Sequence, residues 1–240
     1  MALSKRAVVD LYRKRAKRYD WTARLYWLIG FAYDRYRRLA VDALDLDPGD
    51  TVVDIGCGTG LNFLLIEKRI GPTGRIVGVD LTDAMLERAR ERVEREGWEN
   101  VDLVRSDAAA FTFPENVDGV LSTAAITLVP EYDAVIQRAT EALAPGGQIS
   151  IFDFKEPEYA PEWFIRFMVG ITRPFGVTRD LATRHPWESV ARYLPEHTMV
   201  NLYGGFAYVV VGQKAGGGRA DGRPWRRRRG GLHRPLPGRA

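Results

Sequence analysis

The sequence predicts an α/β fold with a doubly wound, mostly parallel β-sheet. Three observations predict it: short β-branched segments alternate with segments of helical periodicity, a glycine-rich loop follows the first of these strands, and two β-rich segments lie side by side near the C-terminal end. Strands that alternate with helices form parallel sheets through right-handed crossovers, whereas two adjacent β-rich segments form an antiparallel hairpin.

Charge divides the 240-residue chain, which is long enough for one substantial core with attachments. Residues 1–40 carry eleven Lys/Arg against three Asp, a net charge of +8, and residues 215–240 carry eight Arg against one Asp, a net charge of +7. The whole chain has a net charge of +4, so the middle is acidic. We expect a basic, aromatic helical leader or lid over residues 1–40, one α/β domain over residues 41–214, and a disordered Arg/Gly-rich tail over residues 215–240.

The first expected element is a basic amphipathic helix from Lys5 to Arg18, where apolar residues recur every three or four positions among Lys and Arg. A turn cluster at residues 47–50 precedes the first strand, Thr51–Ile55, which is short and β-branched. A glycine loop and a helix follow. The unit then repeats with a strand over Arg75–Asp80 and a helix that starts after Thr82, the expected N-cap residue.

Three further parallel strands are expected at Val101–Val104, Val117–Ser122 and Gln148–Phe152, with a helix before the last of them that ends at residues 145–147. The final pair of strands is Met199–Tyr203 and Phe206–Val211, joined by a two-residue turn at residues 204–205. The sheet should therefore end in an antiparallel pair.

Composition limits the location and chemistry of the protein. Cys57 is the sole cysteine, so no disulfide can form within the chain and an oxidising compartment is not indicated. The longest uncharged apolar run, residues 25–33, would span about 14 Å as a helix against roughly 30 Å of bilayer hydrocarbon. We expect a cytoplasmic protein, in peripheral contact with the inner membrane face if its basic leader binds anionic lipid.

The loop between the first strand and the first helix of the domain has the pattern G-x-G-x-G, with Asp54 two residues before it. Glycines there let the backbone approach a ligand, and Asp80 at the end of the next strand is placed to accept hydrogen bonds from ribose hydroxyls. A nicotinamide dehydrogenase would need a glycine at position 61, which is occupied by Leu61. The spacing therefore disfavours a nicotinamide dinucleotide as the ligand.

Four motifs in order resemble those of class I S-adenosylmethionine-dependent methyltransferases, whose fold is Rossmann-like with a reversed last strand. They cover roughly residues 40–155 and are Asp54-Ile55-Gly56-Cys57-Gly58-Thr59-Gly60, Gly78-Val79-Asp80, Ser106-Asp107-Ala108 and Leu143-Ala144-Pro145-Gly146-Gly147. The resemblance implies an enzyme that takes S-adenosylmethionine as its cofactor.

The same resemblance implies the cofactor contacts. The residues of the binding loop are Asp54, Gly56, Cys57, Gly58, Thr59 and Gly60, with the three glycines under the methionine part. Asp80 would hold the ribose, and Asp107 and Ala108 would flank the adenine. Packing on the adenine is expected from Leu81 and Met85, and a position beside the sulfonium from Ser122 and Thr123. Cys57 is interpreted as a small residue that fits the loop, not as a nucleophile.

No metal site is expected, because the three histidines are scattered and no carboxylate ends the strand at Ser122. Asp153 and Lys155 follow a strand at a position where substrate contacts occur, but we interpret them as a solvated pair.

The acceptor is left open between three classes. A sulfonium methyl group is already activated, so alignment and exclusion of water are the main tasks of the protein and leave little trace in sequence. A lipid headgroup amine such as phosphatidylethanolamine, a quinone or other small molecule methylated at carbon or oxygen, and binding of RNA through the Arg-rich tail are the alternatives. Nucleic acid is disfavoured because the segment 122–125 lacks the tetrapeptide of amino-methylating nucleic-acid enzymes.

The leader favours the lipid acceptor. Eight of its 40 residues are aromatic, and it resembles the leader of bacterial phosphatidylethanolamine N-methyltransferases and of quinone methyltransferases. Aromatic faces attract ammonium groups, and a basic helix binds anionic membrane. Tyr19 is the candidate catalytic residue. The alternative is that these aromatic residues only pack the leader against the core; the oligomeric state is left undetermined.

Overall fold

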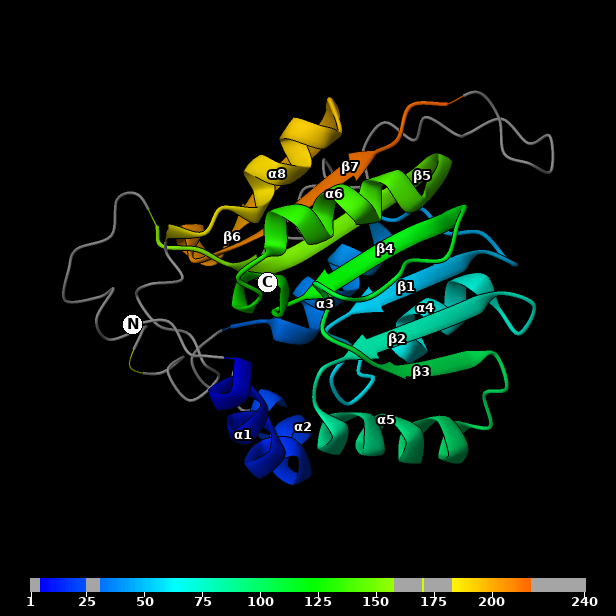
Figure 1. Ribbon diagram of the computed structural model, residues 1–240, viewed down its shortest axis with the longest axis vertical. Helices are drawn as coiled ribbons and strands as arrows, with labels where there is room; N and C mark the ends of the chain where they lie inside the picture. Colours follow the sequence, from blue (N-terminus) through cyan, green and yellow to red (C-terminus); the bar gives the residue numbers. More distant parts are fainter. Residues whose placement is uncertain (1–4, 25–30, 158–169, 171–182, 217–240) are drawn as a thin grey trace, which may run out of the picture.

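A computed structural model describes residues 5–24, 31–157, 170 and 183–216 of the chain, which form a seven-stranded sheet with helices on both faces (Figure 1). The strands are β1 Thr51–Ile55, β2 Arg75–Asp80, β3 Val101–Arg105, β4 Val117–Thr123, β5 Leu143–Phe154, β6 Glu196–Leu202 and β7 Ala207–Gln213. The principal helices are α1 Lys5–Arg15, α2 Tyr19–Arg24, α3 Tyr33–Asp42, α4 Phe63–Ile70, α5 Asp83–Glu96, α6 Tyr132–Ala142 and α8 Pro186–Tyr193, with 3₁₀ turns η1 Ala16–Arg18, η3 Ile126–Leu128 and η6 Tyr203–Gly205.

The sheet has the strand order β3-β2-β1-β4-β5-β7-β6. Neighbours from β3 to β5 are parallel, whereas β7 is antiparallel to both β5 and β6. This confirms the predicted fold class and the reversed final pair. The strand order reverses direction at β1, the topological switch point where ligands bind in open α/β sheets.

Two hydrophobic clusters fill the space between the sheet and its helices. Alternate residues of β1 point to opposite faces, so Val52 packs with α3, α4 and α5 while Val53 packs with α6 and α8. Both valines are fully buried. The rigid sheet therefore holds the carboxyl ends of its parallel strands in fixed positions.

The leader is less regular than the single helix predicted over residues 5–18. It forms α1, then the 3₁₀ turn η1, then α2, and the tighter turn buries Ala16 and brings the Tyr12 and Tyr19 rings to a centroid distance of 6.1 Å. In Figure 1, α1 and α2 lie beside α5 at the carboxyl ends of the parallel strands. The predicted tail lies outside the described residues except for positions 215–216.

Two local predictions are wrong. The final hairpin is closed by the pair Leu202 and Ala207, so its connection contains the four residues 203–206 instead of two. Tyr203 adopts φ 47° there, which lengthens the turn. In addition, β5 begins at Leu143, before the Pro-Gly-Gly segment expected to end a helix, because Leu143 pairs with Val117 of β4 and because Gly146 and Gly147 exchange backbone hydrogen bonds with Lys214.

Thr82 occupies the predicted N-cap position of α5, but its side chain makes no capping hydrogen bond. Its hydroxyl instead interacts with Asp80 at the end of β2. Within the described segments, none of the helices combines the length and apolar character needed to cross a membrane.

Candidate active site

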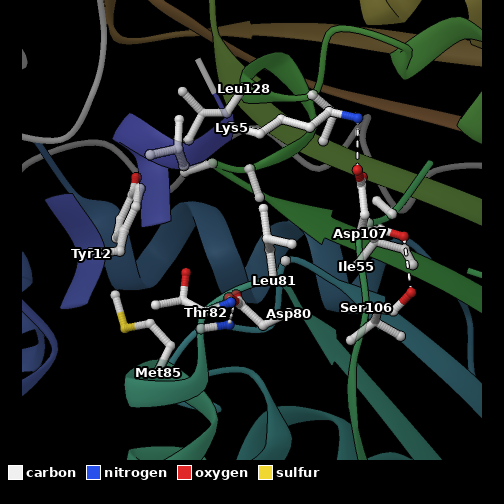
Figure 2. Close-up of a pocket in the computed structure, with 18 of the residues that line it drawn as sticks. Lys5, Tyr12, Ile55, Asp80, Leu81, Thr82, Met85, Ser106, Asp107 and Leu128 are labelled. Carbon is white, nitrogen blue, oxygen red and sulfur yellow. Dashed lines mark hydrogen bonds and ion pairs between the residues drawn. The ribbon is translucent and has the colours of Figure 1, made fainter. Parts of the chain in front are cut away.

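A pocket opens where the carboxyl ends of β1, β2 and β4 and the residues after β3 meet the leader (Figure 2). It encloses about 820 Å³ of space, including its open mouth. Nine of the predicted site residues line it: Tyr19, Gly56, Gly58, Asp80, Leu81, Met85, Asp107, Ala108 and Thr123. Their contacts with a ligand stay predictions.

Five predicted residues do not line the pocket: Asp54, Cys57, Thr59, Gly60 and Ser122. The side chains of four of them, Asp54, Cys57, Thr59 and Ser122, are buried in the protein. The Ser122 hydroxyl donates to the Ile55 carbonyl oxygen inside the sheet, and burial raises the pKa of the Cys57 thiol well above its usual value, so the thiol is not a thiolate nucleophile. These residues lie behind the binding surface.

The glycine loop turns sharply beneath the pocket. Gly56 and Gly58 have φ values of 70° and 57°, in the left-handed region that favours glycine. A Cβ atom on Gly56 would lie 2.3 Å from the Cβ of Ala125, whereas a Cβ on Gly58 would meet nothing within 4 Å. Gly56 is therefore required by close packing, and the space above Gly58 is open to a ligand.

Asp80 ties the loop to the end of β2. Its carboxylate accepts the Gly58 N–H at 2.9 Å and the Thr82 N–H at 2.8 Å. Burial raises the pKa of Asp80 above its ordinary value, and the hydrogen bonds from Thr82 and Gly58 oppose that shift. The carboxylate is thus held in a fixed orientation at the pocket, where it is suited to accept hydrogen bonds from two adjacent hydroxyls.

Lys5 is a pocket residue that the sequence did not indicate, because a leader lysine is expected to be solvated. Its ammonium donates to Asp107 at 2.6 Å (Figure 2). It also donates to Glu131 at 3.0 Å. Burial works against the charge of Asp107, but the hydrogen bonds from Lys5 and the Ala109 N–H hold the pKa of that carboxyl below its usual value. The start of the leader is therefore fastened over the end of the pocket beside β3.

The leader is fastened at two further points. Asp20 accepts a hydrogen bond from the Thr59 hydroxyl and pairs with Arg92, whose Nε also donates to the Thr59 carbonyl oxygen at 2.9 Å. Arg13 forms a two-pronged pair with Asp83, with both distances at 2.8 Å. These contacts give Thr59 a role in holding the leader on the glycine loop.

Tyrosines from the leader form one wall of the pocket. Tyr12 and Tyr19 line it, and in Figure 2 Tyr12 lies on the opposite side from Asp107. Burial, followed by the neighbouring phenol of Tyr33 and then the charges of Asp80 and Asp153, raises the pKa of Tyr12 far above its usual value. Burial also raises the pKa of Tyr33, which is hydrogen-bonded to Tyr19. These phenols stay neutral near pH 7.

The interpretation of Asp153 as a solvated residue is wrong. Asp153 is buried, and its carboxylate accepts the Thr127 N–H at 3.0 Å and its neighbour Phe154 N–H at 2.8 Å. Burial raises its pKa to about 6. Lys155 lies with its ammonium 5.4 Å from the centre of the Trp187 ring. Within the described ranges, no group of three His, Cys, Asp or Glu side chains is placed to hold a metal ion.

Comparison with known proteins agrees with this geometry. Residues 52–147 match the family described as "Methyltransferase domain". The chain is 26% identical over 195 residues to the demethylmenaquinone methyltransferase of Listeria welshimeri, covering 78% of this chain and 82% of that protein. It is 28% identical over 174 residues to the 2-phytyl-1,4-naphtoquinone methyltransferase of Thermosynechococcus vestitus, covering 70% and 76%.

The fold is shared with a solved S-adenosylmethionine-dependent methyltransferase from Aquifex aeolicus, at a TM-score of 0.56 and 20% identity, with 84% of this chain and 97% of that chain covered. The matched domain, the strand order and the glycine loop at its switch point make the chain a class I S-adenosylmethionine-dependent methyltransferase. Its cofactor is S-adenosylmethionine. The pocket fits that molecule, because a fixed carboxylate, an open glycine surface and the apolar side chains of Leu81 and Met85 adjoin one another.

Proposed function

We propose that the acceptor is a quinone-type small molecule in its reduced form. The observation that carries this proposal is the apolar wall of the pocket opposite the cofactor residues. That wall is supplied by Val8 of the leader, by Leu128 at the end of η3, and by Val129 and Pro130 directly after it. Flat apolar rings are the acceptors that such a surface binds through burial of apolar area.

Similarity to relatives supports the same acceptor class. The two quinone methyltransferases named above match this chain over 195 and 174 residues, well beyond the matched domain. The resemblance therefore extends outside the glycine loop that all cofactor-binding relatives share. Carbon and oxygen methylation both remain compatible with this acceptor class.

The chain's own residues have two tasks in such a reaction, since S-adenosylmethionine supplies a methyl group that is already activated. The leader covers the pocket and excludes water from it. Tyr12, as a neutral phenol, and Tyr19 would hydrogen-bond to a hydroxyl or carbonyl oxygen of the acceptor and orient the ring. Tyr19, predicted as the catalytic residue, would thus act by orienting the acceptor.

A lipid headgroup amine such as phosphatidylethanolamine is the second candidate acceptor. The rings of Tyr12 and Tyr19 at the pocket favour it, because aromatic faces attract ammonium groups. RNA is the third candidate, and the Arg-rich tail that suggests it lies outside the described residues.

Product analysis distinguishes these acceptors. The purified chain is incubated with methyl-labelled S-adenosylmethionine and, in turn, reduced demethylmenaquinone, phosphatidylethanolamine vesicles and RNA. We expect label in the quinone fraction, with a rate that falls about tenfold in Tyr19→Phe because one hydrogen bond to the acceptor is lost. Tyr36→Phe, a buried tyrosine outside the pocket, is the control. Label in the phospholipid alone would replace the quinone by the lipid amine.

We also propose that the leader binds anionic membrane, where quinones and phospholipids reside. Lys14 and Lys17 are exposed, and no acidic partner for either is found among the described residues. Trp21, one helical turn further along, is 64% exposed. A basic stripe that ends in an exposed tryptophan suits the boundary between lipid headgroups and acyl chains.

Vesicle co-sedimentation tests this contact. Each Lys near an anionic surface contributes about 1 kcal/mol, so Lys14→Glu with Lys17→Glu should reduce binding to phosphatidylglycerol vesicles at least tenfold, and Trp21→Ala should reduce it further. Binding of the parent should weaken as salt rises. The matched control reverses Lys68 and Arg95, exposed charges outside the leader. Equal binding by both double variants would contradict a specific role for the leader.

A further inference from the structure

Asn62 follows the glycine loop and occupies the N-cap position of α4. An asparagine there ordinarily caps the helix with its side chain, but Asn62 makes no such hydrogen bond. Its side chain turns inward and is buried. The amide is therefore used for contacts elsewhere, and its partners show what it does.

The amide of Asn62 joins the leader side of the molecule to the pocket. Its oxygen accepts from the Arg37 guanidinium of α3 at 3.1 Å. Its nitrogen donates to Asp54 at 3.0 Å and to the Thr123 hydroxyl at 3.0 Å. A guanidinium can only donate, so Arg37 holds the amide oxygen toward itself and leaves the amide nitrogen to donate to Asp54 and Thr123.

Thr123 is the member of this network that reaches the pocket. Because its oxygen accepts the Asn62 N–H, its own hydrogen is directed elsewhere, and no group in the described part of the chain accepts it. Thr123 ends β4, two strands from Asp80 at the end of β2, so their backbones are separated by two strand spacings, about 10 Å. Asp80 faces the ribose in the predicted arrangement, which leaves Thr123 at the amino-acid end of the cofactor.

Asp54 lies behind the same end of the pocket. It is fully buried, and burial raises its pKa to about 7 against the hydrogen bond from Asn62 and the charge of Arg37. Breaking a buried network of this kind leaves charged groups without partners. Asn62 thus orients Thr123, and Asn62 and Arg37 together favour the ionised form of Asp54.

We infer that Arg37 and Asn62 are positioning residues that direct the Thr123 hydroxyl, with the buried Asp54 carboxyl behind it, toward the amino-acid portion of S-adenosylmethionine. The inference concerns the cofactor and does not depend on the identity of the acceptor. It predicts different effects on the binding of two related molecules. S-Adenosylhomocysteine has the amino-acid portion, whereas methylthioadenosine has the same adenine, ribose and sulfur without it.

Calorimetric titration of the full chain with both molecules tests the inference. Asn62→Leu, which removes the amide at similar volume, should weaken binding of S-adenosylhomocysteine at least tenfold and leave binding of methylthioadenosine within twofold. Asp34→Asn is the matched control, since Asp34 pairs with the same Arg37 but its side chain is 71% exposed. That control should bind both molecules as the parent does.

Thr123→Val keeps the shape of the side chain and removes only the hydroxyl, so it serves if Asn62→Leu does not fold. It should show the same selective loss of S-adenosylhomocysteine. Equal weakening of both molecules, or no weakening of either, would overturn the inference. Failure of the parent to bind either molecule would instead refute the assignment of the pocket to the cofactor.

Discussion

Asp80→Ala is expected to weaken S-adenosylmethionine binding by more than 100-fold while the protein stays folded. The predicted contact places two ribose hydroxyls on one carboxylate, and hydrogen bonds to a charged group contribute about 1.5–3 kcal/mol each. The same carboxylate holds the Gly58 and Thr82 N–H groups, so its loss also loosens the loop under the ligand. Isothermal titration calorimetry measures the change, and circular dichroism checks the fold.

Asp102→Ala provides the control, because Asp102 lies on the adjacent strand β3 with an exposed side chain that pairs with Arg75. It should leave cofactor affinity unchanged. Asp80→Asn keeps the shape and one acceptor oxygen, so its affinity should lie between those of the parent and Asp80→Ala. Parent-like affinity in folded Asp80→Ala would show that the ribose binds elsewhere.

The second large effect is expected at Gly56. Gly56→Ala should lower the free energy of unfolding by about 2–5 kcal/mol, since the left-handed backbone costs about 1–2 kcal/mol for a residue with a Cβ and overpacking costs about 1–3 kcal/mol more. The overlap is with Ala125, whose Cβ would lie 2.3 Å away. Urea denaturation measures the difference.

Gly97→Ala separates the two contributions. Gly97 ends α5 with φ 70°, the same value as Gly56, but a Cβ there would meet nothing within 4 Å. This control should therefore show the backbone cost alone. If the two variants are equally destabilised, the loop does not pack against residue 125 as described.

The regular part of the fold was predictable because its central strands, such as β1 and β2, are short, β-branched and buried on both faces. β1 and β2 have the predicted bounds, since a turn cluster and a glycine loop mark their ends. The start of β5 was not predictable. Pro-Gly-Gly in a sequence indicates a break between elements, but here backbone pairing with Lys214 continues the strand through it. Long-range partners of this kind leave no local pattern.

Some residues of the candidate site were also predictable from the sequence, and others were not. Residues at the ends of parallel strands, such as Asp80 and Thr123, come together in any sheet of this topology. Lys5 and Asn62 could not be found from spacing, because a lysine in a basic leader and an asparagine before a helix have ordinary local explanations. Their partners come from distant parts of the chain, since Lys5 meets Asp107 after β3 and Asn62 meets Arg37 of α3.

The position of β7 has a consequence for synthesis of the chain. β7 lies between β5 and β6, and its pairing with β5 joins residues as far apart as Gln148 and Gln213. During translation, β1 to β5 emerge first and leave the β5 edge with unpaired backbone groups until residue 213 has left the ribosome. An open edge of this kind is a template for pairing with other chains. The interval in which the nascent chain is prone to aggregation therefore ends only with its last strand.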